Sequence, residues 1–390
     1  MKLSEGYQTL CYFTRGVNGF MPLNPQYLAF FLLLAAPMGN AAEVERRFHT
    51  MGTELNLTVQ APDRAAALAA SDAAFGAVHD AEQRLSTWIP DSELSRVNLT
   101  PAGEERRLSP RLARDLAGAL ECGRATAGAF APGVGALVKA WALRTGGRRP
   151  DAREIDEARA SASADTVSLQ GNRIVRRDDG FLFEEGGFGK GVGLDDAMAA
   201  LAATEANGAV LDLGGQVAVW GDVVSDVAIA DPRRRDEIAL RMLIARGSIA
   251  TTGNSERGIV VEGERLGHVL DPRTGRPSAD FGSLTVWAED AATADCLATG
   301  LYVLGPEQAL CWAAGREDVA LVAVRETPQG LEALASPQLR DRLTGVADDL
   351  VLRFPAVSET CAEPTELDAS FIFIPRGRAW GTGVQGVPGN

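Results

Sequence analysis

A glycine-rich stretch, residues 184–196, is the part of this chain that most restricts how it can fold. Glycine occupies positions 186, 187, 189, 191 and 193. The apolar run 181–183 precedes the stretch, and a run with helical character, 196–204, follows it. Glycine permits positive φ angles and lets a ligand approach the backbone closely. A turn that enters a helix also presents unsatisfied N–H donors and partial positive charge, so this stretch is expected to suit phosphate.

Lys190 lies inside this stretch, and lysine is rare in the chain. It occurs only at positions 2, 139 and 190, and the remaining basic residues among the 38 are arginines. This rarity favours a phosphate-binding role for Lys190, with a solvated lysine in a flexible loop as the alternative. The stretch is not a Walker A loop, because Gly191 follows Lys190 where Ser or Thr is required. It also departs from G-x-G-x-x-G, because Val192 holds the last position.

The chain is acidic, with a formal net charge of −14. This charge argues against nucleic acid or an anionic membrane as a partner. It also means that a phosphate ligand would need a cation beside it. The 390 residues are enough for one large domain or two smaller ones. We predict one catalytic domain over residues 42–345 and a weakly patterned C-terminal extension over residues 346–390.

The N-terminal segment is predicted to be a signal peptide. Residues 28–36 form an apolar run, shorter than the ~20 residues of a membrane-spanning helix. Small residues follow at Gly39, Ala41 and Ala42. Cleavage after Ala41 or Ala42 is therefore expected, which gives a signal peptide over residues 1–41 and a mature chain without a transmembrane span. Met21 is an alternative start. The expected location is the periplasm.

Four cysteines follow the predicted cleavage site, at positions 122, 296, 311 and 361. Their spacing matches neither a C-x-x-C pair nor a zinc site. We favour buried, unpaired cysteines, and a single disulfide is the alternative, since an exported protein meets an oxidising compartment.

Hydrophobic periodicity predicts several helices and, in the second half of the chain, a succession of short and largely antiparallel strands. Helices are expected at residues 63–85, 109–126 and 291–304. A hairpin is expected around Asp178-Asp179-Gly180, within residues 166–183. Trp88, just past the first helix, is either a ring that stacks on a planar ligand or an ordinary core residue.

Asp295 and Thr299 are four residues apart in the last of these helices, and they therefore lie on one face. A carboxylate and a hydroxyl at this spacing form half of a site for a hard cation. In the alternative, Thr299 bonds back to the Asp295 carbonyl and Asp295 acts as a cap. The spacing alone does not separate the two.

Five motifs occur in order along the chain, and together they carry a resemblance to a known family. They are Met51-Gly52-Thr53, the run Ser-Thr-Trp-Ile-Pro-Asp-Ser-Glu-Leu at 86–94, Gly-Gly-Phe-Gly-Lys-Gly at 186–191, His268-x-x-Asp-Pro-Arg-Thr-Gly and Ala294-Asp295-x-x-Ala-Thr299. From about Arg46 to about Leu343 the chain resembles the ApbE-type FAD:protein FMN transferases. The resemblance implies an ApbE-type, T-fold-like α+β fold, Mg²⁺ as cofactor, and transfer of FMN from FAD to a Ser or Thr hydroxyl of a partner flavoprotein.

The resemblance also implies a set of site residues. Asp295, Thr299 and the Gly187 carbonyl would hold Mg²⁺. His268 would lie near the reacting phosphate and take the hydroxyl proton, with Asp295 as the second catalytic residue. The residues that would contact FAD are Met51, Trp88, Ala129, Phe130, Ala131, Glu184, Lys190 and Leu270.

The chain departs from the family pattern at several of these positions. Ala131 replaces the usual Asp of a Phe-Asp-Pro turn, Glu184 replaces Asp, and Trp88 replaces Tyr. Because of Ala131, two alternative functions stay open. One is a FAD-binding or carrier protein without transferase activity, and the other is a pyrophosphatase that cleaves FAD to FMN and AMP. The expected FMN acceptor is an exported or membrane-anchored redox protein.

Overall fold

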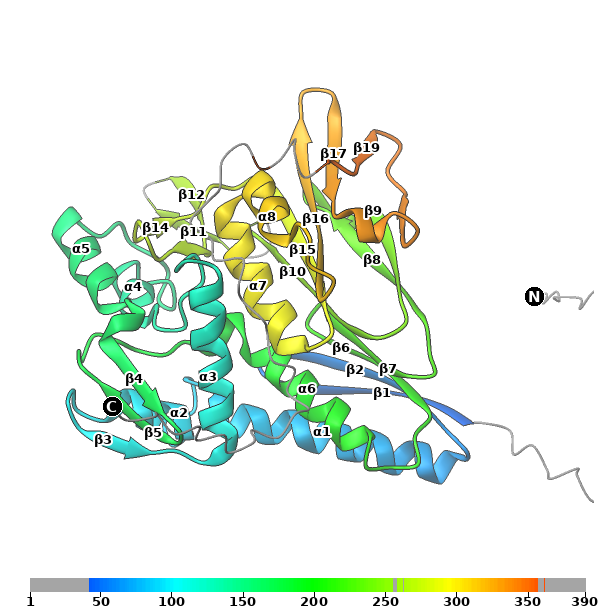
Figure 1. Cartoon of the computed structure of the whole chain (residues 1–390), viewed down its shortest axis with the longest axis horizontal. Helices are drawn as coiled ribbons and strands as arrows, with labels where there is room; N and C mark the ends of the chain where they lie inside the picture. The colour runs from blue at the N-terminus through cyan, green and yellow to red at the C-terminus, as the bar shows by residue number, and fades with distance from the viewer. Residues whose placement is uncertain (1–41, 255–257, 262, 357–360, 362–390) are drawn as a thin grey trace, which may run out of the picture. The chain divides into compact units, whose positions relative to one another are not determined.

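The computed structural model describes residues 42–254, 258–261, 263–356 and 361. The predicted signal peptide, the alternative start at Met21 and most of the predicted C-terminal extension lie outside the described residues. The described residues cluster as one compact unit, to which the helices and strands of Figure 1 belong.

A nine-stranded sheet forms the centre of this unit (Figure 1). It starts from the hairpin of its first two strands, and its neighbouring strands are antiparallel except for the last pair, β17 and β19. The predicted antiparallel architecture is therefore confirmed, and β19 lies after residue 345, where the sequence shows little pattern. The strands in spatial order are β1 (Ala42–Thr50), β2 (Thr53–Ala61), β6 (Gly208–Leu213), β7 (Gln216–Gly221), β10 (Gly247–Gly253), β15 (Gly282–Ala288), β16 (Val319–Thr327), β17 (Gly330–Ala335) and β19 (Leu350–Arg353).

Both faces of this sheet are covered, and strand β16 shows how. Leu321 and Ala323 belong to the core cluster that the helices share, whereas Val322 and Val324 belong to a second cluster on the opposite face. This alternation follows from the two-residue period of a strand, and burial on both faces explains why β16 is continuously apolar. The second cluster is closed by a three-stranded sheet of β18 (Leu343–Gly345), β9 (Arg234–Ile244) and β8 (Ser225–Asp231).

Five helices form the helical layer, and α1, α6 and α7 pack side by side in that order (Figure 1). The predicted helix starts are confirmed by their caps: the Asp63 carboxylate accepts from the Ala66 N–H, and the Ser109 hydroxyl accepts from the Leu112 N–H. The helices are α1 (Arg64–Leu85), α3 (Pro110–Ala125), α6 (Gly189–Leu201), α7 (Ala291–Leu304) and α8 (Pro306–Ala313).

Shorter elements lie beside α3 (Figure 1). A cluster that contains Leu137, Trp141, Ile155 and Leu270 holds several of them together. They are α2 (Glu93–Leu99), α4 (Gly135–Ala140) and α5 (Ala152–Ser161), the sheet β3 (Glu105–Arg107), β5 (Arg173–Arg176) and β4 (Val167–Gln170), and the hairpins β11 (Gly258–Val261) with β12 (Glu264–Gly267) and β13 (Leu270–Asp271) with β14 (Arg276–Pro277).

A buried arginine joins three of the helices. Arg84 of α1 donates from Nε to Asp115 of α3 at 2.9 Å and from Nη2 to Asp196 of α6 at 2.7 Å. Its side chain is 8% exposed, and that of Asp115 is fully buried. A buried guanidinium is tolerated because carboxylates from two sides neutralise it and accept its hydrogen bonds.

Two predictions of local structure were wrong. The hairpin forms at Gly171-Asn172, between β4 and β5, and not around residues 178–180. Gly171 has a φ of +58°, so the tight turn uses a glycine in the left-handed region. The second error concerns α6, which begins at Gly189 and not near Asp196, so Lys190 lies in its first turn. Intrinsic propensity disfavours glycine in a helix, and here packing against α7 overrides it.

The preference for unpaired cysteines was also wrong. Cys122 and Cys296 form a disulfide between α3 and α7, and Cys311 and Cys361 form a second one that attaches the segment after β19 to α8. The partners are 174 and 50 residues apart in the sequence. Pairs so distant cannot be inferred from spacing, because only the fold brings them together.

Candidate active site

Helices α6 and α7 approach each other more closely than side chains would allow. A Cβ atom built on Gly191 would lie 2.3 Å from the Ala291 carbonyl oxygen and 2.5 Å from the Ala292 Cα. The Asp195 carboxylate of α6 accepts hydrogen bonds from the backbone N–H groups of Ala291 and Ala292, at 2.7 and 3.0 Å. Asp195 thereby supplies the N-terminal cap of α7, and the two helices are held in one fixed register.

Asp295 faces the N-terminal turn of α6 across this contact. Its Oδ2 accepts from the Gly191 N–H at 3.0 Å, and its Oδ1 accepts from Lys190 Nζ at 3.2 Å. The side chain of Asp295 is 7% exposed and that of Lys190 is 31% exposed. The sequence therefore correctly predicts Asp295 and the glycine turn as neighbours. The buried Asp295 carboxylate therefore lies beside an ammonium group and a helix N-terminus. This charged group of residues is exposed to solvent at Lys190.

Thr299 and Gly187 adjoin Asp295. A Cβ on Gly187 would lie 3.3 Å from Thr299 Oγ1, so glycine lets the 3₁₀ turn Glu185–Gly187 come close to α7. The Thr299 hydroxyl also donates to the Asp295 carbonyl oxygen at 3.5 Å, as the structural alternative proposed. The other half of that alternative was wrong, because α7 begins at Ala291 and Asp295 is not a cap.

A divalent cation at this position would depend on mixed oxygen ligands. Among the described residues there is no group of three or more His, Cys, Asp or Glu side chains that could hold a metal. Mg²⁺ does not require such a group, because it is commonly bound by one or two carboxylates together with water and substrate phosphates. Asp295, Thr299 and the Gly187 backbone provide oxygen donors of this kind, so the residues fit the predicted cation.

The small-residue turn 129–131 packs against the same helix. The Phe130 N–H donates to the Thr126 hydroxyl at 3.0 Å, and a Cβ on Gly300 of α7 would lie 2.9 Å from the Phe130 Cβ. Ala129 is fully buried and Phe130 is 4% exposed, whereas Ala131 is half-buried. The Phe130 ring also lies 3.0 Å from a Cβ built on Gly187. Phe130 therefore packs against the glycine turn at Gly187.

Met51 reaches α6 from the other side. It lies in the turn between β1 and β2 with a φ of +51°, next to Gly52 at +69°. Its N–H donates to Glu82 of α1 at 2.8 Å, and its methyl group lies 3.1 Å from a Cβ built on Gly193. The predicted contact of Met51 with FAD stays a prediction, and the structure places the side chain against the glycine-rich helix.

Trp88, Glu184 and Arg144 form a cluster at the start of the glycine stretch, called the second wall below. Trp88 is 67% exposed, so the interpretation as a core residue was wrong. The Arg144 guanidinium lies 4.3 Å from the Trp88 ring centroid, and its Nη2 donates to Glu184 Oε2 at 2.5 Å. Burial raises the pKa of the Glu184 carboxyl above its ordinary value, and the charge of Arg144 opposes this effect.

His268 lies between β12 and β13 and is half-buried. The neighbouring Val269 N–H donates to Asn254 Oδ1 at 3.2 Å, which fixes this segment to the end of β10. Leu270 is 7% exposed and packs with Leu137 and Trp141. The contacts of His268 and Leu270 with FAD stay predictions.

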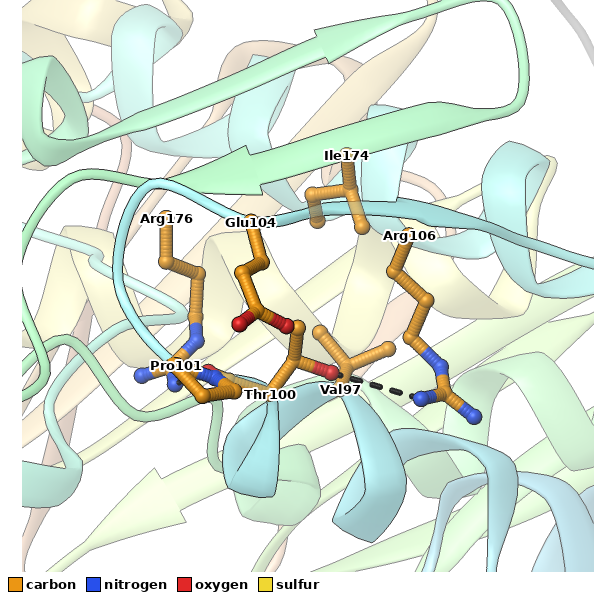
Figure 2. A pocket seen from close by; sticks show the side chains of 7 residues that line it. All are labelled: Val97, Thr100, Pro101, Glu104, Arg106, Ile174 and Arg176. Carbon is orange, nitrogen blue, oxygen red and sulfur yellow. Dashed lines mark hydrogen bonds between the residues drawn. The ribbon is translucent and has the colours of Figure 1, made fainter.

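A hollow away from these residues lies between α2 and the β3–β5 pair (Figure 2). Its wall includes Arg176, which is 4% exposed and donates to the carbonyl oxygens of Phe181 (2.6 Å) and Thr100. The hollow has no room for a water molecule. Arg176 therefore has a structural role, since it hydrogen-bonds to the segments around the hollow. The candidate site remains the one at α6 and α7.

Sequence patterns did not identify three residues of this site. Asp195 and the Gly191 N–H form hydrogen bonds across the contact between α6 and α7. Arg144 bonds to Thr87 and Glu184, which are 57 and 40 positions away in the chain. Only the tertiary fold brings these groups together. The density of glycine was interpreted as close approach of a ligand to the backbone, whereas at Gly191 it allows close approach of α7.

Comparison with known proteins decides the family. The ApbE family profile matches residues 51–323, which is more than half of the chain. The chain belongs to the ApbE family. This match covers the α1, α6 and α7 helices as well as the 129–131 turn and the His268 segment, and the predicted family and fold are confirmed.

Similar sequences and structures agree with the assignment. A FAD:protein FMN transferase of Rhodobacter capsulatus is 31% identical over 80% of this chain, and the chain spans 60% of the length of that relative. A FAD:protein FMN transferase of Vibrio cholerae is 28% identical over 81% of this chain and 98% of its own length. The structure of the Thermotoga maritima ApbE protein has a TM-score of 0.67 at 27% identity, covering 73% of this chain and 95% of its own. The flavin transferase ApbE of Vibrio cholerae, at 24% identity and a TM-score of 0.67, has the same fold over 77% of this chain and 99% of its own.

Proposed function

We propose that this protein transfers FMN from FAD to a Ser or Thr hydroxyl of a partner flavoprotein and releases AMP. The observation that carries the proposal is the group formed by Asp295, Lys190 and the Gly191 N–H, within a member of the ApbE family. Two similar proteins named FAD:protein FMN transferase support the reaction class.

Mg²⁺ is the proposed cofactor, held by Asp295, Thr299 and the Gly187 carbonyl. When bound, the cation would supply positive charge to the pyrophosphate of FAD. This charge is needed because the chain carries a formal net charge of −14, and Lys190 is the cation that the chain itself provides at the site.

The residues then have the following roles in the proposed transfer. The oxygen of the acceptor hydroxyl attacks the phosphorus of the FMN half, and the bond from that phosphorus to the bridging oxygen breaks, so AMP leaves with the oxygen. Lys190 and the N-terminal turn of α6 orient the phosphates, and His268 takes the proton of the hydroxyl. The nucleophile belongs to the partner, so the site needs mainly positioning and electrostatic stabilisation.

The reaction is tested by incubating the protein with FAD, MgCl₂ and a peptide that contains the acceptor hydroxyl. We expect a flavinylated peptide, detected by mass spectrometry, together with AMP. Free FMN without labelled peptide would identify a pyrophosphatase, and unchanged FAD in the presence of a cognate acceptor would identify a carrier.

The cation hypothesis predicts distinct effects for two variants. Asp295→Ala should abolish transfer, because it removes the carboxylate ligand, and Thr299→Ala should raise the Mg²⁺ concentration required for half-maximal rate. Asp156→Ala is a matched control, since that carboxylate is exposed and pairs with Arg159. Full activity of Asp295→Ala at low Mg²⁺ would reject the assignment.

Export to the periplasm is part of the proposal, and so is an exported or membrane-anchored redox protein as the acceptor. The two disulfides support an oxidising compartment. Within the ranges that the structure describes, no helix is long and apolar enough to cross a membrane. Proteolytic release of residues 1–41 in vivo, measured by N-terminal sequencing, tests the export.

A further inference from the structure

Arg144 links two segments that are far apart in the chain. It lies between α4 and α5, and its Nη2 donates to Thr87 Oγ1 and to Glu184 Oε2, each at 2.5 Å. Thr87 in turn donates from its N–H and its hydroxyl to Glu185, at 3.0 and 2.6 Å. The loop after α1 and the start of the glycine turn are therefore joined directly, by Thr87 and Glu185, and also through the Arg144 guanidinium group.

The same guanidinium stacks on Trp88. With its charge centre 4.3 Å from the ring centroid, Arg144 covers one face of the indole. Trp88 is nevertheless 67% exposed, so most of the ring surface faces solvent. An indole clamped on one face and open on the other is a surface on which a second planar group can stack.

Glu184 completes the arrangement. Its side chain is 19% exposed, and a carboxylate in such a place is costly unless a cation neutralises it. Arg144, itself 30% exposed, supplies this cation and fixes one carboxylate oxygen. The second oxygen keeps its capacity to accept a hydrogen bond from a ligand.

We propose that Arg144 is a positioning residue for the binding of FAD, because it holds the indole of Trp88 as a stacking surface and the carboxylate of Glu184 as an acceptor. The inference rests on the proposed function, because it takes the planar group that stacks on Trp88 to be a ring of FAD. Arg144 touches neither Asp295 nor Lys190 in this role, so it acts on ligand affinity and not on the transfer step.

The test compares Arg144→Met, which removes the charge and keeps much of the stem, with Arg144→Lys, which keeps a charge but loses the planar fork. Arg148→Met is the control, because Arg148 lies in the same loop and pairs with the exposed Glu154. We expect KM for FAD to rise about tenfold in Arg144→Met and less in Arg144→Lys, with kcat at saturating FAD within about twofold of the parent protein. Arg148→Met should leave both constants unchanged.

A double-mutant cycle with Trp88→Leu separates positioning from a general structural effect. If Arg144 acts through Trp88, the double variant should lose less FAD affinity than the sum of the single losses. Additive losses, or an Arg144→Met protein that binds FAD like the control, would overturn the inference. If Arg144→Met does not fold, as judged by circular dichroism, the comparison of Arg144→Lys with Arg148→Met decides. Failure of the parent protein to bind FAD would reject the proposed function, whereas parent binding with unaffected Arg144 variants would reject only the role of Arg144.

Discussion

The two walls of the candidate site are built in different ways. At the contact between α6 and α7, the Asp295 side chain is 7% exposed and bonds to a backbone N–H group and a lysine. At the second wall, Trp88 is 67% exposed, and the contacts are made by long side chains, those of Arg144 and Glu184. The first wall depends on how closely two helices pack, and the second depends on how side chains pair.

This difference fits three of the departures from the family pattern, whereas a fourth, Phe188-Gly189 where the family commonly has Ile-Ala, lies at the start of α6. Trp88 and Glu184 belong to the wall of paired side chains, and Ala131 lies in the partly exposed part of its turn. None of these three residues is part of the helix contact. A side chain near solvent can change with little effect on its neighbours, whereas a change at a packed helix contact must be accommodated by the backbone.

The largest expected effect comes from breaking the support of the packed wall. Arg84→Met removes the buried cation that donates hydrogen bonds to Asp115 and Asp196, and it leaves only the longer ion pairs with the half-exposed Arg114, at 3.9 and 3.8 Å. We expect the free energy of unfolding to fall by about 3–5 kcal/mol, as measured by urea denaturation. Arg153→Met, which breaks an exposed pair with Glu157, should leave the free energy of unfolding almost unchanged. Equal losses in the two variants would contradict the importance of the buried network.

The disulfides allow a sharper comparison. Replacing Cys122 and Cys296 by alanine should lower the free energy of unfolding by about 2–5 kcal/mol. Because Cys296 is adjacent to Asp295 on α7, this variant should also require more Mg²⁺ for half-maximal transfer. Replacing Cys311 and Cys361 should destabilise the protein without changing the Mg²⁺ requirement, since neither residue lies on α7. The same shift in both variants would show that the Cys122–Cys296 bond has no specific effect on the site.

The smallest effect is expected on the exposed side. Ala131→Asp restores the carboxylate that is typical of the family at a half-buried position. If that carboxylate contributes one hydrogen bond to FAD, affinity should change by about 0.5–1.5 kcal/mol, and transfer should proceed in both proteins. Titration of flavin fluorescence measures the affinity. A native protein that binds FAD but labels no acceptor, with labelling restored by Ala131→Asp, would show that the carboxylate is needed for the reaction.

The sequence predicted those parts of the molecule that local patterns determine. Helix α7 was predicted over its observed range because it has a continuous apolar pattern, and two helices were predicted to start at Asp63 and Ser109, which the structure shows to be their caps. The start of α6 was missed because glycine has a low helix propensity, although packing against α7 decides the outcome. The role of Arg144 and the disulfides were missed because their partners are distant in the chain. Those contacts become visible only when the fold is known.

The close approach at Gly191 also affects how sequence variation in the family should be interpreted. The atoms that a Cβ would meet there, the Ala291 carbonyl oxygen and the Ala292 Cα, belong to the main chain, so no change of rotamer can move them away. Selection should therefore retain glycine at this position in any relative with the same helix spacing, including relatives that bind a different ligand or have lost activity. Gly191 is next in sequence to Lys190 and bonds to Asp295, a ligand of the proposed Mg²⁺ site. Its conservation would reflect the spacing of the two helices, and it would not by itself identify an active enzyme.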